Sequence, residues 1–202
     1  MSFYHDWILP RLQHAAMRQE MFAPYRERLA AQAEGLVLEI GIGSGLNLPL
    51  YGGRVTGVVG LEPSRPLLDL ARQVSHRGPA VALIRGSAER MPLRDASVDT
   101  VMTTWTLCSI PDVAQALREA RRVLKPSGRL LFVEHGRTSN PRVDRWQDRL
   151  TPIWKRVAGG CHLNRDTRRL VEDAGFRIER IEGSYVPGPK PWTFMSEGCA
   201  RR

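Results

Sequence analysis

The sequence predicts an α/β fold: a doubly wound, mostly parallel sheet with an antiparallel pair of strands at its C-terminal end. Short apolar runs alternate with stretches of helical periodicity, which is typical of strands joined by crossover helices. The residues after Gly175 instead read as two strands in succession. With 202 residues, 42% hydrophobic and 25% charged, the chain matches one globular domain rather than a disordered or fibrous protein.

Apolar runs bounded by glycine or turn residues predict the strands, because a strand buried on both faces of a parallel sheet is apolar throughout. The expected parallel strands cover residues 36–40, 55–61, 81–84, 98–103 and 129–134, and the antiparallel pair covers 176–181 and 194–201.

Helical spacing of apolar residues predicts the remaining elements. Residues 3–34 are expected to be helical, divided by Pro10 and Pro24. The clearest helix begins after Asp112, a suitable N-cap, and is expected to end at Pro126 and Gly128. Further helices are predicted over 65–75 and 165–174.

Charge is the unusual feature of the composition. Thirty Lys and Arg against 21 Asp and Glu give a net charge of +9, which taken alone favours an anionic partner. From Arg137 onward there are 14 basic and 8 acidic residues, a net of +6. The arginines are scattered, without a basic tract or interleaved aromatics, so we expect a solvated basic surface and no nucleic-acid partner. Peripheral contact with a membrane remains open, as does the oligomeric state.

The three cysteines are widely spaced and predict neither a disulfide framework nor a metal site. Cys161 and His162 are adjacent but lack further ligands at suitable spacing, so no metal is expected. The cysteines suggest a reducing, cytoplasmic setting, and no apolar run reaches the roughly 20 residues of a transmembrane helix.

A glycine-rich segment follows the first predicted strand and is expected to open a helix. Gly41, Gly43 and Gly45 allow the backbone to turn sharply and approach a ligand. Their spacing differs from a dinucleotide-binding loop, because Leu46 stands where the third glycine belongs. Glu62 closes the second strand, where a carboxylate can accept both hydroxyls of a ribose.

Four motifs, in this order and spacing, resemble class I S-adenosylmethionine-dependent methyltransferases, which have a Rossmann-like fold. They are Glu39-Ile40-Gly41-Ile42-Gly43-Ser44-Gly45, Glu62, Gly86-Ser87-Ala88-Glu89-Arg90-Met91-Pro92-Leu93 and Arg121-Arg122-Val123-Leu124-Lys125-Pro126-Ser127-Gly128. The resemblance implies S-adenosyl-L-methionine as cofactor and S-adenosyl-L-homocysteine as product. It covers about residues 36–135, the expected cofactor-binding core of a single domain (1–202). We expect the N-terminal helices (1–34) to form a lid and residues 136–202 to supply acceptor-side helices and closing strands.

The resemblance also implies a set of cofactor contacts. Glu39 and the three glycines would line the methionine and ribose, and Glu62 would bind the ribose hydroxyls. The adenine would lie along Ser87, Ala88 and Glu89, although Ser87 stands where many members have Asp. The remaining implied contacts are Pro63, Ser64 and Thr104.

Later segments resemble a small methyltransferase branch that includes thiol S-methyltransferases. They are Thr106-Leu107-Cys108-Ser109-Ile110, Glu134-His135, Trp146-Gln147, Pro152-x-Trp154-Lys155, Gly160-Cys161-x-Leu163-x-Arg165-x-Thr167 and Ala174-x-Phe176. The branch implies a small, fairly apolar acceptor, with a thiol favoured. We expect Cys108, Trp146 and Trp154 at the acceptor pocket, although aromatic side chains on helices also serve as core. His135 is the candidate base, or alternatively a histidine bonded to a loop.

Other functions stay open at this point. A phospholipid, quinone-type or nucleic-acid methyltransferase would use the same cofactor. Against methylation of a nucleobase amino group, Thr103-Thr104-Trp105-Thr106 follows the fourth strand in place of Asn/Asp-Pro-Pro-aromatic. A cofactor-binding module without turnover and an NAD-dependent dehydrogenase are the remaining alternatives.

Overall fold

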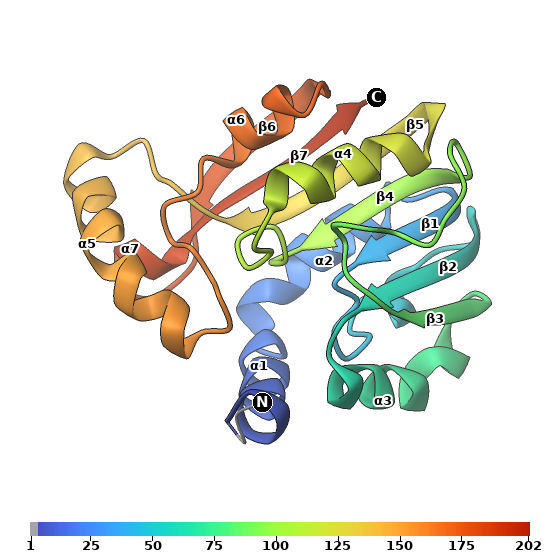
Figure 1. Ribbon diagram of the computed structural model, residues 1–202, viewed down its shortest axis with the longest axis horizontal. Helices are drawn as coiled ribbons and strands as arrows, with labels where there is room; N and C mark the ends of the chain where they lie inside the picture. Colours follow the sequence, from blue (N-terminus) through green and yellow to red (C-terminus); the bar gives the residue numbers. More distant parts are fainter. Residues whose placement is uncertain (1–3) are drawn as a thin grey trace.

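The computed structural model describes residues 4–202 and contains one seven-stranded sheet. Its strands are β1 (Gly35–Ile40), β2 (Val55–Glu62), β3 (Val81–Arg85), β4 (Val98–Thr104), β5 (Leu124–His135), β6 (Arg177–Tyr185) and β7 (Phe194–Arg201). The order across the sheet is β3-β2-β1-β4-β5-β7-β6. The first five strands pair in parallel, and β7 lies antiparallel between β5 and β6 (Figure 1). The predicted fold class is confirmed.

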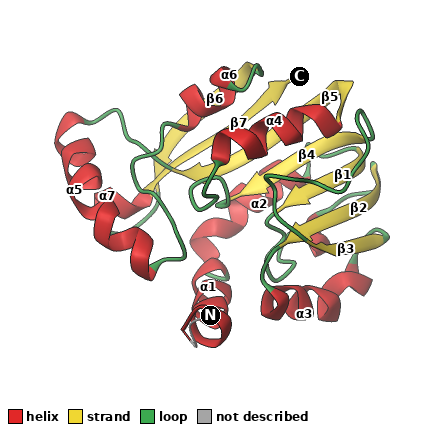
Figure 2. Cartoon of the chain, in the orientation of Figure 1, coloured by secondary structure: helices red, strands yellow, loops and turns green. Residues whose placement is uncertain are grey.

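Helices cover both faces of this sheet (Figure 2). They are α1 (Leu9–Met17), α2 (Ala23–Ala30), α3 (Arg65–Val74), α4 (Val113–Val123), α5 (Pro141–Val157), α6 (Thr167–Asp173) and α7 (Lys190–Thr193). One hydrophobic core joins the sheet to α4 and α6, and a second joins the opposite face to α2 and α3. Both faces of the central strands are therefore buried, which explains why β1 and β2 are mostly apolar.

The N-terminal segment is divided as predicted. Pro10 and Pro24 lie in the first turns of α1 and α2, where a missing N–H costs no helical hydrogen bond. A π-helical turn at Tyr4–Ile8 precedes α1, and a 3-10 turn at Glu20–Phe22 separates the two helices. The first residue of the predicted helical segment, residue 3, lies outside the described residues.

The expected helix after the glycine-rich segment is wrong. Between β1 and β2 the chain forms only a 3-10 turn, Leu48–Leu50. Gly41, Gly43 and Gly45 adopt φ values of +67°, +56° and +78°, which no right-handed helix contains. The loop therefore presents single backbone N–H groups, not the N-terminus of a helix.

Several predicted boundaries also move. The helix after Asp112 ends at Val123, before Pro126 and Gly128, because Leu124 already pairs with Val98 as the first residue of β5. At the other end of the chain β6 excludes Phe176 and extends to Tyr185, which pairs with Phe194. Asp166 caps α6, which begins two residues later than predicted.

Replacing Asp112 with alanine is expected to lower the free energy of unfolding by about 1 kcal/mol. The Asp112 side chain accepts a hydrogen bond from the backbone N–H of Gln115 and so caps α4. Urea unfolding measures the change. Asp112→Asn keeps an accepting oxygen and should retain most of the stability; equal losses in both variants would contradict a capping role.

Candidate active site

The site lies at the carboxyl ends of the parallel strands. The glycine loop follows β1, Glu62 ends β2, Thr104 ends β4 and His135 ends β5. These ends share one edge of the sheet because β1, β2, β4 and β5 pair in parallel. The order reverses between β1 and β4, which is where open α/β sheets bind their ligands.

Glu62 is fixed at this edge by backbone donors. Its Oε2 accepts from the N–H of Gly43 at 3.1 Å and its Oε1 accepts from the N–H of Ser64 at 2.9 Å. Burial raises the pKa of Glu62, partly offset by those two hydrogen bonds. Each carboxylate oxygen keeps a further lone pair, so Glu62 can accept a pair of neighbouring hydroxyls.

Open space lies above the loop at Gly43. Its φ of +56° disfavours any side chain, and an added Cβ would meet nothing nearer than the carbonyl of Gly41, at 3.9 Å. At Gly41, by contrast, a Cβ would overlap the side chain of Thr106. The loop therefore packs on Thr106 at Gly41 and faces open space at Gly43, beside Glu62. This open space suits a nucleoside whose ribose contacts the Glu62 carboxylate.

Glu39 is fully buried beneath the loop, in a polar network. Its carboxylate accepts from Asn47 Nδ2 at 2.6 Å and from the Tyr51 hydroxyl at 2.8 Å. The Asn47 amide also donates to Thr104 Oγ1, at 3.2 Å. Burial raises the pKa of Glu39 to about 7, against its hydrogen bonds and the charge of Arg26. Glu39 and Thr104 thus support the loop from within the core, and their contact with the cofactor stays a prediction.

The raised pKa of Glu39 makes stability depend on pH. Folded Glu39 holds its proton up to about pH 7, whereas the unfolded carboxyl releases it near 4.5, so the free energy of unfolding falls as pH rises through this range. The difference corresponds to about 3 kcal/mol. Urea unfolding at about pH 4.5 and about pH 8 should show a smaller loss in Glu39→Gln than in the wild type. The same pH dependence in both proteins would contradict this assignment.

The predicted adenine segment forms a pinned turn after β3. The Ser87 hydroxyl donates to Glu89 Oε2 at 2.5 Å, and Glu89 Oε1 accepts from the N–H of Asp112 at 2.8 Å. Ala88 is buried between them, while Pro63 is exposed on the neighbouring loop. The turn lies next to Glu62, because β2 and β3 pair up to Glu62 and Arg85.

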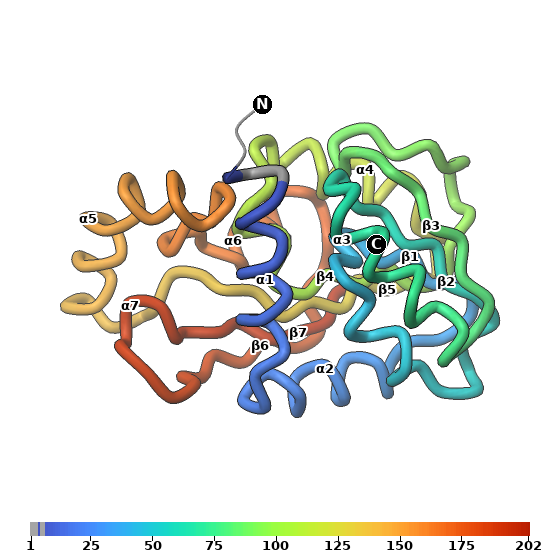
Figure 3. Tube along the Cα trace, turned by 90° about the horizontal axis from the view of Figure 1, so that it is seen from below, coloured from blue at the N-terminus to red at the C-terminus, as the bar shows by residue number. Residues whose placement is uncertain are grey.

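Helix α1 also reaches the glycine loop. His14 Nδ1 lies 2.7 Å from Ser44 Oγ, and Figure 3 shows α1 between α5 and α3. The periodicity of the N-terminal segment gave no sign of this contact, since His14 is an isolated polar residue. It is consistent with the predicted lid, whose role stays a prediction.

Glu134 shapes the loop after β4. Its carboxylate accepts from the N–H groups of Thr106 and Cys108, at 3.2 and 3.4 Å, and from the Thr103 hydroxyl. Burial raises the pKa of Glu134 to about 7, although the hydrogen bonds oppose the shift. These bonds hold Cys108 at the carboxyl end of β4.

Three distant segments meet at His135. Its Nδ1 lies 3.5 Å from Cys161 Sγ, and Nε2 is buried without a hydrogen-bond partner among the described residues. Cys108 and Trp154 lie beside the Cys161 thiol, and the indole Nε1 of Trp154 is also buried without a hydrogen-bond partner among the described residues. Hydrogen bonds from Cys108 and His135 lower the pKa of Cys161, whereas the Cys108 pKa is raised by its bond to Cys161 and by burial. We call Cys108, His135, Trp154 and Cys161 the sulfur cluster.

Trp146, the third predicted pocket residue, does not join the sulfur cluster. It is 54% exposed on the outer side of α5. Cys161 carries no acceptor-site signal in the sequence, because its neighbours come from the loop after β4, from the end of β5 and from α5. In the described part of the chain no group of three or more His, Cys, Asp or Glu side chains is arranged to hold a metal ion.

Trp105 is a further residue that the sequence did not single out. It follows β4 with φ +52°, a rare conformation for a bulky residue and one that clusters at functional sites. Its indole donates to Met195 Sδ at 3.1 Å, and the Arg26 guanidinium lies 4.6 Å from the ring centroid. These contacts fix the chain just before Thr106, which packs under the glycine loop.

Known proteins match this architecture. A methyltransferase-domain family model matches residues 38–132. A thiol S-methyltransferase of Rattus norvegicus is 33% identical, over 87% of this chain and 72% of its own length. A phosphatidylethanolamine N-methyltransferase of Cereibacter sphaeroides is 34% identical over 84% of each chain. This chain belongs to the class I S-adenosylmethionine-dependent methyltransferases.

The fold comparison agrees. The crystal structure of a methyltransferase from Bacillus halodurans superposes with a TM-score of 0.71, at 19% identity, over 90% of this chain and 96% of its own. The sheet is thus Rossmann-like. Because the chain belongs to this family, the protein is an enzyme whose cofactor is S-adenosylmethionine. Membership in this family sets aside the NAD-dependent dehydrogenase and the module without turnover.

The residues present fit that cofactor. Glu62 would accept from the ribose hydroxyls, the open side of Gly43 would accommodate the sugar, and the turn at Ser87–Glu89 would border the base. When bound, S-adenosylmethionine supplies a methyl group on a sulfonium that leaves as a thioether. The enzyme then needs mainly to align the acceptor and, where the acceptor arrives protonated, to remove its proton.

Proposed function

We propose that the methyl acceptor is a small, fairly apolar molecule carrying a thiol. The observation that carries the proposal is the surroundings of His135 Nε2. This buried nitrogen has no partner in the described residues and lies in the sulfur cluster, whose other members are two thiols and an indole. Sulfur and aromatic groups favour a soft, apolar acceptor.

The neighbouring carboxylate does not suit an amine acceptor. Glu134 is bonded to the backbone N–H groups of Thr106 and Cys108 and to the Thr103 hydroxyl. An ammonium group at this edge could pair with Glu134 only by displacing the hydrogen bonds through which this carboxylate holds the loop. A thiol needs no such partner, only a base.

His135 supplies that base. The acceptor S–H would donate to Nε2, and the proton would pass to the imidazole as the sulfur forms its bond to the methyl group. The Nδ1 contact with Cys161 orients the ring toward this position. Glu134, one residue earlier on β5, fixes the loop after β4 that carries Cys108. The end of β5 would therefore position both the base and the loop opposite it.

The relatives support two acceptors. The rat relative, a thiol S-methyltransferase, agrees with the sulfur cluster. The Cereibacter relative acts on phosphatidylethanolamine by its name and covers more of its own length, so a phospholipid amine is the second candidate. The cytoplasmic setting inferred from the cysteines is also a proposal. Among residues 4–202, no helix is long and apolar enough to cross a membrane.

An acceptor panel tests the proposal. The enzyme is incubated with methyl-labelled S-adenosylmethionine and matched alkyl compounds that carry a thiol, an amine or a phenol, and products are identified by mass. We expect methyl thioethers, with kcat/KM rising as the alkyl chain lengthens. Methylation of the amine in preference to the thiol of the same chain length would contradict the proposal.

A further inference from the structure

The outer side of α5 carries a row of exposed apolar side chains. Trp146, Ile153 and Val157 are 54%, 66% and 50% exposed, and Leu150 lies half-buried among them. Their spacing of three, four or seven residues places them on one stripe of the helix. Single exposed apolar residues are ordinary, but a contiguous stripe indicates an interaction surface.

A basic stripe runs beside the apolar one. Arg142, Arg145, Arg149 and Arg156 are all exposed, and none of them forms an ion pair with a described residue. The acidic residues of α5 do not neutralise them, because Asp144 and Asp148 both bind Arg137, at 2.5 and 2.8 Å. The helix therefore presents four uncompensated positive charges along its apolar row. We call these two stripes together the α5 face.

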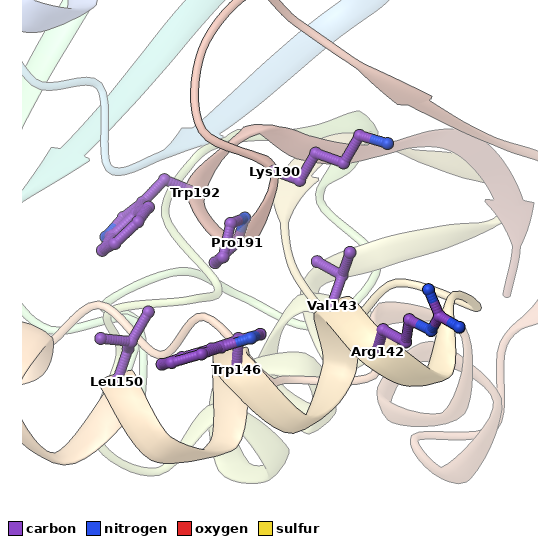
Figure 4. A pocket seen from close by; sticks show the side chains of 7 residues that line it. All are labelled: Arg142, Val143, Trp146, Leu150, Lys190, Pro191 and Trp192. Carbon is purple, nitrogen blue, oxygen red and sulfur yellow. The ribbon is translucent and has the colours of Figure 1, made fainter.

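A hollow of about 430 Å³ opens between α5 and α7 on this face. Its walls are Val143, Trp146, Leu150, Pro191 and Trp192. Figure 4 shows these side chains facing one another from the two helices, with Arg142 and Lys190 toward one end. This hollow is complementary to a lipid, because its apolar walls suit an acyl chain and the cations at one end suit a phosphate.

We propose that the α5 face docks on an anionic lipid surface. Tryptophan and long aliphatic side chains beside arginine are the composition of helices that lie in a membrane interface. Nucleic acid would engage the arginines through its phosphates, but it would leave Ile153 and Val157 in water. A lipid surface accepts both stripes at once.

The α5 face adjoins the proposed acceptor site. The Tyr4 hydroxyl donates to the carbonyl of Val157 at 2.6 Å, and the chain then passes Gly159, beside Leu9, to Cys161 in the sulfur cluster. Docking would hold this end of the molecule near the lipid, where apolar acceptors concentrate. The docking proposal does not depend on whether the acceptor is a thiol.

Vesicle flotation of the full chain tests the proposal. We expect binding to vesicles of phosphatidylcholine with phosphatidylglycerol and none to phosphatidylcholine alone. The triple variant R142Q/R145Q/R149Q should bind about 100-fold more weakly and W146Q/I153Q about tenfold more weakly. The matched control R77Q/R94Q/R118Q removes the same charge from exposed arginines elsewhere and should bind like the wild type.

Four results would overturn the docking proposal. They are no flotation of the wild type with anionic vesicles, an equal loss in the control triple, undiminished binding by W146Q/I153Q, and tighter binding to duplex RNA than to vesicles. Thermal stabilisation by S-adenosylmethionine, measured on every variant, confirms that each is folded. Because flotation requires no turnover, its failure is distinguishable from failure of the thiol assay.

Discussion

Replacing Glu62 with alanine is expected to weaken S-adenosylmethionine binding about 100-fold. The carboxylate is held toward the open side of the glycine loop by the N–H groups of Gly43 and Ser64, so it meets both ribose hydroxyls in a fixed geometry. Two charge-assisted hydrogen bonds to a buried carboxylate together supply about 3 kcal/mol, which corresponds to that loss. Isothermal titration calorimetry measures the dissociation constant directly.

Stability provides a second readout for Glu62. Burial raises the pKa of Glu62, so its ionised carboxylate costs free energy in the folded protein and offsets the hydrogen bonds from Gly43 and Ser64. Alanine should therefore change the stability of the ligand-free enzyme little at neutral pH. Glu172→Gln, on the exposed part of α6, is the control and should leave binding unchanged. Unaltered cofactor affinity in Glu62→Ala would show that the ribose does not lie at the end of β2.

Replacing His135 with asparagine is expected to lower kcat for an alkanethiol about 100-fold, a usual contribution of a general base. The amide of the introduced asparagine would occupy the place of Nδ1 beside Cys161, and the substitution would remove the unpartnered Nε2. An aromatic thiol, already ionised near neutral pH, should lose much less because its thiolate needs no base. Steady-state kinetics with both thiols separates proton removal from simple packing.

The pH profile provides the control for this variant. The alkanethiol rate of His135→Asn should rise with pH until the thiol ionises by itself, and it should then approach the wild-type rate. His135→Gln places an amide near the Nε2 position. This amide cannot accept the proton, so the variant should show the same pH profile as His135→Asn. Equal losses for the alkyl and the aromatic thiol would contradict a base role and leave His135 as a positioning residue.

Most strands could be predicted from the sequence because each is a short apolar run closed by a breaker. The observed bounds of β2 (Val55–Glu62) and β7 (Phe194–Arg201) lie within one residue of the predicted bounds. Helix α5 was not delimited, because Pro152 lies inside it and its exposed side mixes tryptophan with arginine. The absent helix after β1 follows from the alternating left-handed glycines Gly41, Gly43 and Gly45, because glycine permits this conformation but does not require it.

The candidate site, like the fold, was predicted from the sequence only in part. The position of Gly43 beside Glu62 was predictable, because Gly43 follows β1 and Glu62 ends the neighbouring strand β2, at a motif spacing. In the sulfur cluster, Cys108, His135 and Trp154 had been named from the sequence. Cys161 had not, because only the fold brings its segment beside His135. His14 and Asn47 gave no signal at all, because their polar contacts depend on how α1 and the glycine loop are placed.

The most direct test of the central claim is a competition for the methyl group. One reaction contains the enzyme, methyl-labelled S-adenosylmethionine, an apolar alkanethiol and vesicles of phosphatidylethanolamine, and mass spectrometry identifies the methylated products. The sulfur cluster around His135 predicts the methyl thioether as the main product, reduced about 100-fold in His135→Asn. Methylated phosphatidylethanolamine as the main product, insensitive to that substitution, would contradict the account.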